Sequence, residues 1–193
     1  MTDKGKLEMK RKFSMLFILL FVMSFVVVAE KHAQAIQDET ATRYTSIING
    51  LLTATIDKIG NSRSSVVANI GKPLSISTEL VANPNKPLQD DRIHILIYDG
   101  IIIWIYQTTG NNKEKLLSVR FTKNRKDIFP DLIGKSEEYI ISTFGQPTSI
   151  SEGRNRYDLT DDDESALGFI ELEFKNSSVD AVELTYYIDR SNA

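Results

Sequence analysis

Residues that carry most enzyme chemistry are scarce in this chain. It contains no Cys and only two His. His32 lies in the flank of an apolar N-terminal stretch, and His94 lies within an apolar run typical of a strand. We therefore exclude thiol chemistry, catalytic triads and most zinc sites, and we expect His94 to be an ordinary strand residue.

The carboxylates offer two further candidates for chemistry. The run 161–164 (DDDE) suggests a calcium ligand set, but it lacks the central Gly and the twelfth-position Glu of a hand loop, so a solvated turn is expected. Glu171 and Glu173 are two residues apart and can project from one face of a strand as a pair. No matching general acid accompanies them. We expect no enzymatic activity, no cofactor and no metal site.

One segment of the chain occurs twice. Residues 57–77 (DKIGNSRSSVVANIGKPLSIS) and 131–151 (DLIGKSEEYIISTFGQPTSIS) align without a gap at an offset of 74, and nine of the 21 positions are identical. Self-similarity of this kind indicates a repeat architecture. Neither copy has the Gly-rich loop followed by Lys and Ser/Thr that holds phosphate.

Each copy predicts a short capped helix. Ser62 and Ser136 are candidate N-caps, because a Ser hydroxyl can accept a free backbone N–H at a helix start. Gly71 and Gly145 fit the position just after a helix, where φ is often positive, and a Pro two residues later prevents continuation. A further amphipathic helix is predicted over 44–59.

Strands are predicted after each of these helices, from runs rich in β-branched and aromatic residues. The predicted strands cover 92–98, 101–107, 116–121, 154–159, 168–174 and 179–188. The Asp99-Gly100 pair between the first two runs is a strong hairpin signal. Apolar and polar residues alternate cleanly in the last two strands, which indicates an antiparallel sheet with one buried face.

The polar face of this sheet is the candidate binding surface. In a two-layer arrangement helices cover one side of a sheet, and the other side can stay open. Trp, Tyr and Arg are the side chains that anchor many protein interfaces. The candidate partner-binding residues are Tyr98, Trp104, Tyr106, Arg120, Arg156, Phe169, Glu171, Glu173 and Tyr187.

The first hairpin leaves an alternative open. By alternation, the face that holds Trp104 is expected to hold His94, Leu96, Tyr98, Ile102 and Tyr106. Because the run 101–107 is apolar at almost every position, Trp104 and Tyr106 could instead lie in the core, with the intervening Ile residues facing outward.

The N-terminus predicts export. A basic head precedes the uncharged stretch 13–29, and Ala33-Gln34-Ala35 is a small-x-small site suited to signal peptidase. The stretch also reaches the lower limit of length for crossing a bilayer, so an uncleaved anchor is the alternative. Either way the rest of the chain is expected in the periplasm or at the cell surface. The true start is Met1 or Met9, which the sequence leaves open.

The exported part is acidic. Six of the 23 Lys and Arg and three of the 26 Asp and Glu precede residue 36, which leaves 17 basic and 23 acidic residues after it. Nucleic acids and anionic lipids attract basic surfaces. We therefore expect another envelope protein as partner, no nucleic acid, and membrane contact only through 13–29 if that segment is uncleaved.

The Ile-Gly-x-Ser … Gly-x-Pro string of each copy, followed by strands, resembles two known groups. One is the SmpA/OmlA (BamE-type) outer-membrane assembly lipoprotein family, and the other is the beta-lactamase inhibitor protein, which carries two such modules in tandem. The resemblance spans 44–188. This chain departs from both, since the lipoproteins carry a lipidated Cys, the inhibitors are disulfide-bonded, and no Cys is present.

The resemblance implies an α+β fold of two tandem ααβ repeats, with short helices packed on one face of a curved antiparallel sheet. The expected domains are a signal peptide or anchor (1–35), a first helix-helix-sheet repeat (36–125) and a second helix-sheet repeat (126–193).

Two hypotheses for function follow from this organisation. The first is an exported, non-enzymatic protein-binding module of the bacterial envelope, of the assembly-factor, adaptor or inhibitor type. The alternative is a membrane-tethered structural module of an envelope complex, held by an uncleaved N-terminal helix.

Overall fold

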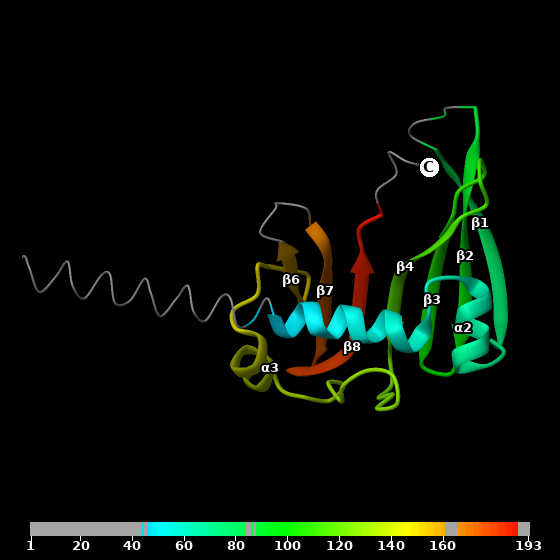
Figure 1. Cartoon of the computed structure of the whole chain (residues 1–193). Coiled ribbons are helices and arrows are strands. Elements are labelled where there is room, and N and C mark those ends of the chain that lie inside the picture. The colour runs from blue at the N-terminus through cyan, green and yellow to red at the C-terminus, as the bar shows by residue number, and fades with distance from the viewer. Residues whose placement is uncertain (1–43, 45, 84–85, 87, 161–165, 189–193) are drawn as a thin grey trace, which may run out of the picture. The chain divides into compact units, whose positions relative to one another are not determined.

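Runs of β-branched and aromatic residues form strands, which account for more of the described chain than the helices do (Figure 1). The computed structural model describes residues 44, 46–83, 86, 88–160 and 166–188. Residues 44–193 group as one unit, apart from residues 1–43. The predicted signal stretch with its cleavage site, His32 and the acidic run 161–164 lie outside the described residues.

Eight strands make one antiparallel sheet. They are β1 (Ser75–Ala82), β2 (Asp90–Tyr98), β3 (Ile101–Gln107), β4 (Glu114–Phe121), β5 (Ser149–Ser151), β6 (Arg154–Thr160), β7 (Ala166–Lys175) and β8 (Ser178–Tyr186). Their order across the sheet is β1-β2-β3-β4-β8-β7-β6-β5. Two meanders of four strands each therefore meet at the β4–β8 pairing in the middle of the sheet.

The six predicted strands are confirmed to within a few residues at their ends, and Asp99-Gly100 is confirmed as the β2–β3 turn. Strands β1 and β5 are not predicted by the sequence pattern. Both begin in the Ser-Ile-Ser that follows Pro73 and Pro147. Nearly every residue in them is exposed, so no alternation of apolar and polar residues marks them as strands.

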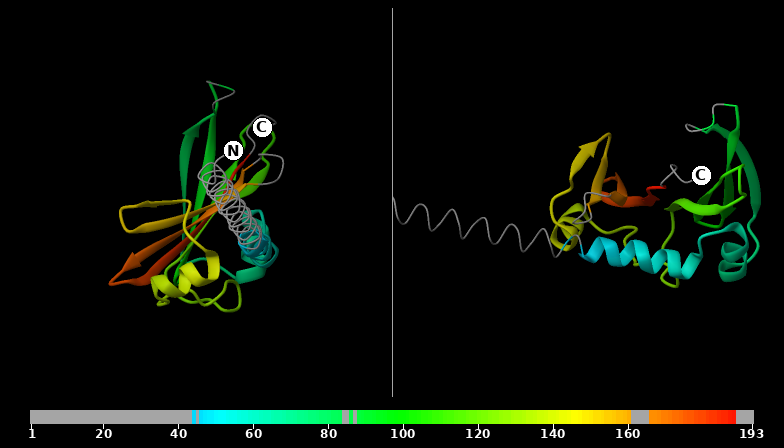
Figure 2. Two further views of the ribbon diagram at one scale, coloured as in Figure 1. Left: turned by 90° about the vertical axis from the view of Figure 1, so that its left-hand side faces the viewer. Right: turned by 45° about the horizontal axis from the view of Figure 1, so that its top comes forward.

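The helices within the described residues lie on one side of the sheet (Figure 2). They cover 46–59, α2 (Arg63–Ile70) and α3 (Glu137–Phe144). The 46–59 helix is anchored to β8, because the Tyr186 hydroxyl donates to the carbonyl oxygen of Leu52 at 3.1 Å. Val66 of α2 and Ile140 of α3 are fully buried in the same core. This side is called the helix side below.

The predicted helix caps are confirmed. The Ser62 hydroxyl accepts from the Ser65 backbone N–H, and the Ser136 hydroxyl accepts from the Tyr139 backbone N–H. Gly71 and Gly145 end the two helices with φ of 91° and 78°, a region that glycine enters without steric cost. The two copies of the repeated segment thus share their local geometry.

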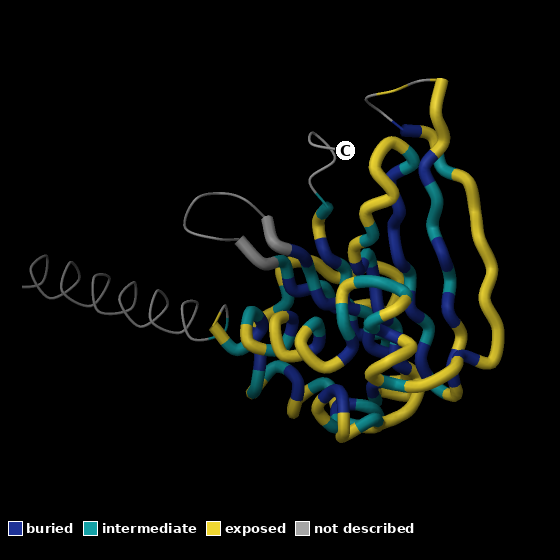
Figure 3. Tube along the Cα trace, turned by 45° about the vertical axis from the view of Figure 1, so that its right-hand side comes forward, coloured by how far each residue is buried: buried dark blue, intermediate teal, exposed yellow. Residues whose placement is uncertain are grey.

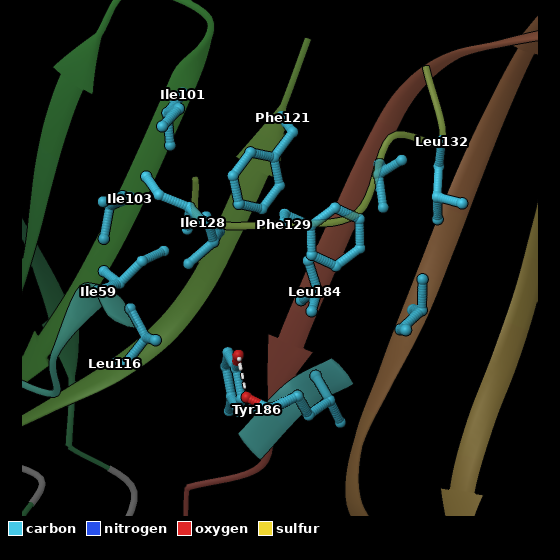
Figure 4. Packing of buried hydrophobic residues seen from close by; sticks show 14 of the residues in the cluster. Ile59, Ile101, Ile103, Leu116, Phe121, Ile128, Phe129, Leu132, Leu184 and Tyr186 are labelled. Atoms are coloured by element: carbon cyan, nitrogen blue, oxygen red, sulfur yellow. Dashed lines mark hydrogen bonds between the residues drawn. The ribbon is translucent and has the colours of Figure 1, made fainter. Parts of the chain in front are cut away.

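The core lies between the helices and the inward faces of β2, β3, β4, β7 and β8 (Figure 4). Ile59 from the 46–59 helix is fully buried, as are Ile103 and Leu184 from the sheet. Burying a side chain of this size stabilises the fold by about 1.5–3 kcal/mol. The segment after β4 closes one end of the core, where the rings of Phe121 and Phe129 stack with centroids 4.9 Å apart.

The fold class expected from the sequence is wrong. Two tandem ααβ repeats require a helix pair in each copy, but the described chain is mainly one eight-stranded antiparallel sheet with few, short helices. The second copy has no counterpart of the 46–59 helix. Residues 122–136, which precede α3, form turns around Pro130, where proline removes a backbone donor and disfavours helix.

Among the helices that the structure describes, none combines the length and the apolar character needed to cross a bilayer.

Candidate functional site

The side of the sheet opposite the helix side gathers charged and aromatic residues from both meanders. Cross-strand pairing places Trp104, Ser118, Thr185 and Phe169 in one row, and Arg120, Glu183, Glu171 and Arg156 in the next. No described helix covers them (Figure 2). We call this surface the open face; its members are Ile95, Ile97, Ile102, Trp104, Ser118, Arg120, Arg154, Arg156, Asp158, Phe169, Glu171, Glu173, Glu183, Thr185 and Tyr187.

Arg120 is the centre of the charged part of the open face. Its guanidinium contacts Glu173 Oε2 at 2.6 Å and Glu183 Oε2 at 3.5 Å. The other Glu183 oxygen accepts from the Ser118 hydroxyl at 2.9 Å. Arg154 lies 3.8 Å from both Glu171 and Glu173. The network holds side chains from four strands, β4, β6, β7 and β8, in one arrangement.

Arg156 organises a second cluster beside this network. Its guanidinium donates to Asp158 Oδ1 at 2.8 Å and to the Tyr187 hydroxyl at 3.0 Å. The same group lies 3.7 Å from the centroid of the Phe169 ring, within the range of a cation–π interaction. The rings of Phe169 and Tyr187 are tilted with centroids 6.0 Å apart. One arginine therefore positions two aromatic rings, and Tyr187 stays 49% exposed.

The other half of the open face is apolar. Ile95 pairs with Trp104 and Ile97 pairs with Ile102 across β2 and β3. Ile97 is 37% exposed, while Ile95, Ile102 and Trp104 are half-buried. The open face thus joins an apolar area on β2 and β3 to a paired-charge area on β4, β6, β7 and β8.

The expected face grouping of the first hairpin is wrong. A two-residue turn places Tyr98 opposite Ile101, so the residues that share a face with Tyr98 are Ile101, Ile103 and Ile105, not Trp104. Tyr98 lies on the helix side, where it is buried and its hydroxyl donates to the Gly71 carbonyl oxygen at 3.0 Å. It is therefore not part of the open face.

Tyr106 has the same strand parity as Trp104 but is buried. Only 1% of it is exposed, and its hydroxyl donates to Asp91. The remaining candidate residues are brought together on the open face by the register of the sheet: Trp104, Arg120, Arg156, Phe169, Glu171, Glu173 and Tyr187.

The surroundings of Glu173 on the open face do not suit a general acid. The hydrogen bond from Arg120 lowers the pKa of Glu173 below its ordinary value, whereas a general acid at neutral pH needs a raised pKa. His94 lies on the helix side, buried between Thr78 and Gln107 at 2.8 and 2.9 Å, as expected for a strand residue. Within the described residues, no three His, Asp or Glu side chains are placed to hold a metal ion.

Four residues of the charged part are not among the candidate partner-binding residues from the sequence: Ser118, Arg154, Asp158 and Glu183. Asp158 is two residues after Arg156, so their shared face is readable from alternation alone. Ser118 and Glu183 meet only because β4 pairs with β8, two strands that no local signal connects. Arg154 shows the same alternation as Arg156.

No family model and no curated protein matches the chain. Among solved structures it is similar to an extracellular protein containing a SCP domain from Bacillus anthracis, with 12% identity and a TM-score of 0.43 over 70% of this chain. This chain spans 46% of that protein's length. It is also similar to a DUF4309 family protein from Bacillus subtilis, with 12% identity and a TM-score of 0.39 over 74% of this chain and 97% of the other.

The resemblance drawn from the repeated motif is wrong, because the chain folds into one eight-stranded antiparallel sheet and not into the two tandem ααβ modules that the resemblance implies. The motif specifies a Ser-capped helix ended by Gly, and such a helix terminus is a local solution that unrelated folds can share.

Proposed function

We propose that this chain is an exported, non-enzymatic protein-binding module of the bacterial envelope, and that its partner contacts the open face. Export is supported by the basic head, the uncharged stretch 13–29 and the Ala33-Gln34-Ala35 site. The partner is expected to be another envelope protein.

The observation that carries this proposal is the union of aromatic and arginine side chains on one helix-free face. Trp104, Phe169 and Tyr187 lie there with three arginines, and Trp, Tyr and Arg are the residues enriched at interface hot spots. The ion pairs of Arg120 and Arg156 hold these groups in place before a partner arrives, which lowers the ordering cost of binding.

The charge of the face indicates the kind of partner. Three arginines stand beside four carboxylates, those of Asp158, Glu171, Glu173 and Glu183, and most of these charges are paired with one another. A near-neutral surface does not attract phosphates or anionic headgroups. A folded protein with its own polar and aromatic surface fits this face better.

Two single substitutions test the proposal. Trp104→Ala and Tyr187→Ala remove exposed or half-buried aromatic surface, and a hot spot costs about 2 kcal/mol or more in binding, roughly 30-fold in affinity. The tagged chain is recovered from native envelope membranes, and the co-purified partner is quantified by mass spectrometry and then titrated with each purified variant.

The matched control is Tyr139→Ala. Tyr139 on α3 is 45% exposed, a fraction similar to that of Tyr187, but it lies on the helix side. We expect it to leave partner affinity unchanged. The melting temperature of every variant is measured in parallel. Equal affinity for the wild type and the two open-face variants, or a loss of affinity that tracks unfolding, contradicts the proposal.

The mature N-terminus decides between release and tethering. Mass spectrometry of the native protein is expected to find a chain that begins at Ile36, after cleavage behind Ala35. A native chain that still begins at Met1 or Met9 would instead support the membrane-tethered alternative.

A further inference from the structure

Strand β1 is a long edge strand exposed along nearly its whole length (Figure 3). It pairs with β2 on one side only, and no described strand pairs with its other side. Seven of its eight residues are exposed. An edge of this kind presents a row of backbone N–H and C=O groups that can pair with another strand.

Two of the usual protections against such pairing, Lys and Pro, are missing from β1. Its sequence, Ser-Ile-Ser-Thr-Glu-Leu-Val-Ala, contains no Lys and no Pro, the residues that commonly block an edge. Its apolar side chains are also unusually open to solvent: Ile76 is 56% exposed and Leu80 is 66% exposed, and Leu74 just before the strand is 75% exposed. The opposite edge strand, β5, has only three residues.

The order of residues in β1 is complementary to itself. When the strand is paired antiparallel with a second copy so that Thr78 faces Thr78, Ile76 faces Leu80 of the second copy and Leu80 faces Ile76. Ser77 then faces Glu79, so the one charged residue of the strand never faces its own copy. The exposed apolar side chains Ile76 and Leu80 thus oppose each other, and directly opposed like charges, which destabilise strand pairs, are avoided.

We propose that two copies of this chain pair antiparallel along β1, with Thr78 on the two-fold axis. The pairing joins two eight-stranded sheets into one and brings Leu74, Ile76 and Leu80 of both copies together on the helix side of the joined sheet. This surface is separate from the open face, so the inference goes beyond the proposed function and leaves that face free in the dimer.

A second copy fits this edge better than the other edge of the same chain does. Pairing of β1 with β5 of another copy would be heterologous and would build rings or open filaments, but β5 offers only three residues to pair. The β1–β1 contact is closed by its two-fold symmetry.

Charge substitutions at the two facing positions test the register. In the double variant Ile76→Lys, Leu80→Lys, like charges face each other, and we expect dimer affinity to fall roughly 100-fold or more. In Ile76→Lys, Leu80→Glu, each Lys faces a Glu of the second copy, and we expect the dimer to persist. The chain is studied in its native length, with a mild detergent added if 13–29 is retained, and its mass is measured by sedimentation velocity at increasing protein concentration.

The matched control is Ile150→Lys on β5, since Ile150 occupies the same place in the second Ser-Ile-Ser and is 66% exposed. It should leave the dimer unchanged. The proposal is overturned if the wild-type chain stays monomeric. It is also overturned if the two double variants lower the dimer affinity equally. Pairing of β1 with an extended segment of another protein would appear as the first of these outcomes.

A cysteine on the proposed axis gives an independent measurement. The chain has no Cys, so Thr78→Cys can form a disulfide only between two copies. Directly opposed side chains approach to about 4.5 Å between Cβ atoms, which a disulfide can bridge. Mild oxidation should cross-link Thr78→Cys but not Ile150→Cys; absence of a cross-link at position 78 overturns the register.

Discussion

The two copies of the repeated segment lead into the two edges of the sheet, and they share more than their sequence. In each, a Ser caps an eight-residue helix and a Gly ends it with a positive φ. In each, a Tyr of the neighbouring strand donates to the carbonyl oxygen of that Gly, Tyr98 to Gly71 and Tyr157 to Gly145. A strand that begins with Ser-Ile-Ser follows in both.

The copies diverge directly after Ser-Ile-Ser. The first continues with Thr-Glu-Leu-Val-Ala, and β1 extends to eight residues. The second continues with Glu152 and Gly153, whose φ of 50° and 75° turns the chain back into β6, so β5 ends after three residues. Positive φ at both residues of a two-residue loop is hairpin geometry. Two residues therefore decide whether an edge is long and open to pairing or short and protected.

The largest difference between the copies is expected at Gly60 and Gly134, which are equivalent and both have positive φ, 99° and 84°. A Cβ at Gly60 would lie 2.6 Å from Ser65 Cβ, while a Cβ at Gly134 would meet nothing within 4 Å. Backbone strain costs about 1–3 kcal/mol, and a steric clash in a packed region adds about 1–3 kcal/mol. Gly60→Ala should therefore lower the free energy of unfolding by about 2–6 kcal/mol, and Gly134→Ala by about 1 kcal/mol.

Urea titration of both glycine variants measures this difference. Equal losses of stability for the two substitutions would mean that the Ser62–Ser65 turn shifts at little energetic cost. The two glycines would then differ in their surroundings but not in their contribution to stability.

The tyrosines give the next contrast. Gly145 is buried whereas Gly71 is exposed, so only the Gly145 carbonyl is cut off from water when its Tyr partner loses the hydroxyl. Tyr157→Phe should cost about 1–3 kcal/mol and Tyr98→Phe about 0.5–1 kcal/mol in the free energy of unfolding. Thermal or urea unfolding at neutral pH measures both, and the reverse order would contradict the assignment of these two bonds.

Alkaline unfolding sharpens the same contrast. Burial raises the pKa of Tyr157 from 10.0 to about 12. The unfolded chain ionises near pH 10 while the folded chain does not, so the stabilising contribution is complete below pH 10 and is lost as the pH rises toward 12. Tyr157→Phe should flatten the fall of stability between these values. Burial also raises the pKa of Tyr186, which stays as an internal reference in the variant.

Much of the local structure is predictable from the sequence, because caps and turns depend on few residues. Ser62, Ser136, Gly71 and Gly145 each act within one helical turn, and Asp99-Gly100 sets a hairpin alone. The two-residue length of that turn also fixes which β3 residues share a face with Tyr98. Alternation alone does not fix this, because β3 is apolar at almost every position.

The assembly of the open face is not predictable in this way. Arg120 contacts Glu183 across 63 residues of sequence, and that contact exists only because the two meanders join at β4 and β8. No pattern within either strand specifies this partner. The edge strands escape prediction for a different reason, since β1 is exposed on both faces and loses the alternation that half-buried strands carry.

The smallest contrast is expected at the two N-caps. Ser62 forms a reciprocal capping box, in which its hydroxyl accepts from the Ser65 N–H and the Ser65 hydroxyl accepts from the Ser62 N–H. Ser136 makes only the first of these bonds, at 3.3 Å, but Glu137 and Glu138 in the first turn of α3 add favourable charge at the helix N-terminus. Ser62→Ala should cost about 1 kcal/mol and Ser136→Ala about 0.5 kcal/mol. The glutamates act through charge, so a higher salt concentration weakens their contribution and should enlarge the loss of stability in Ser136→Ala toward the loss in Ser62→Ala. A difference between the two losses that does not depend on salt would show that the capping box alone separates the two helices.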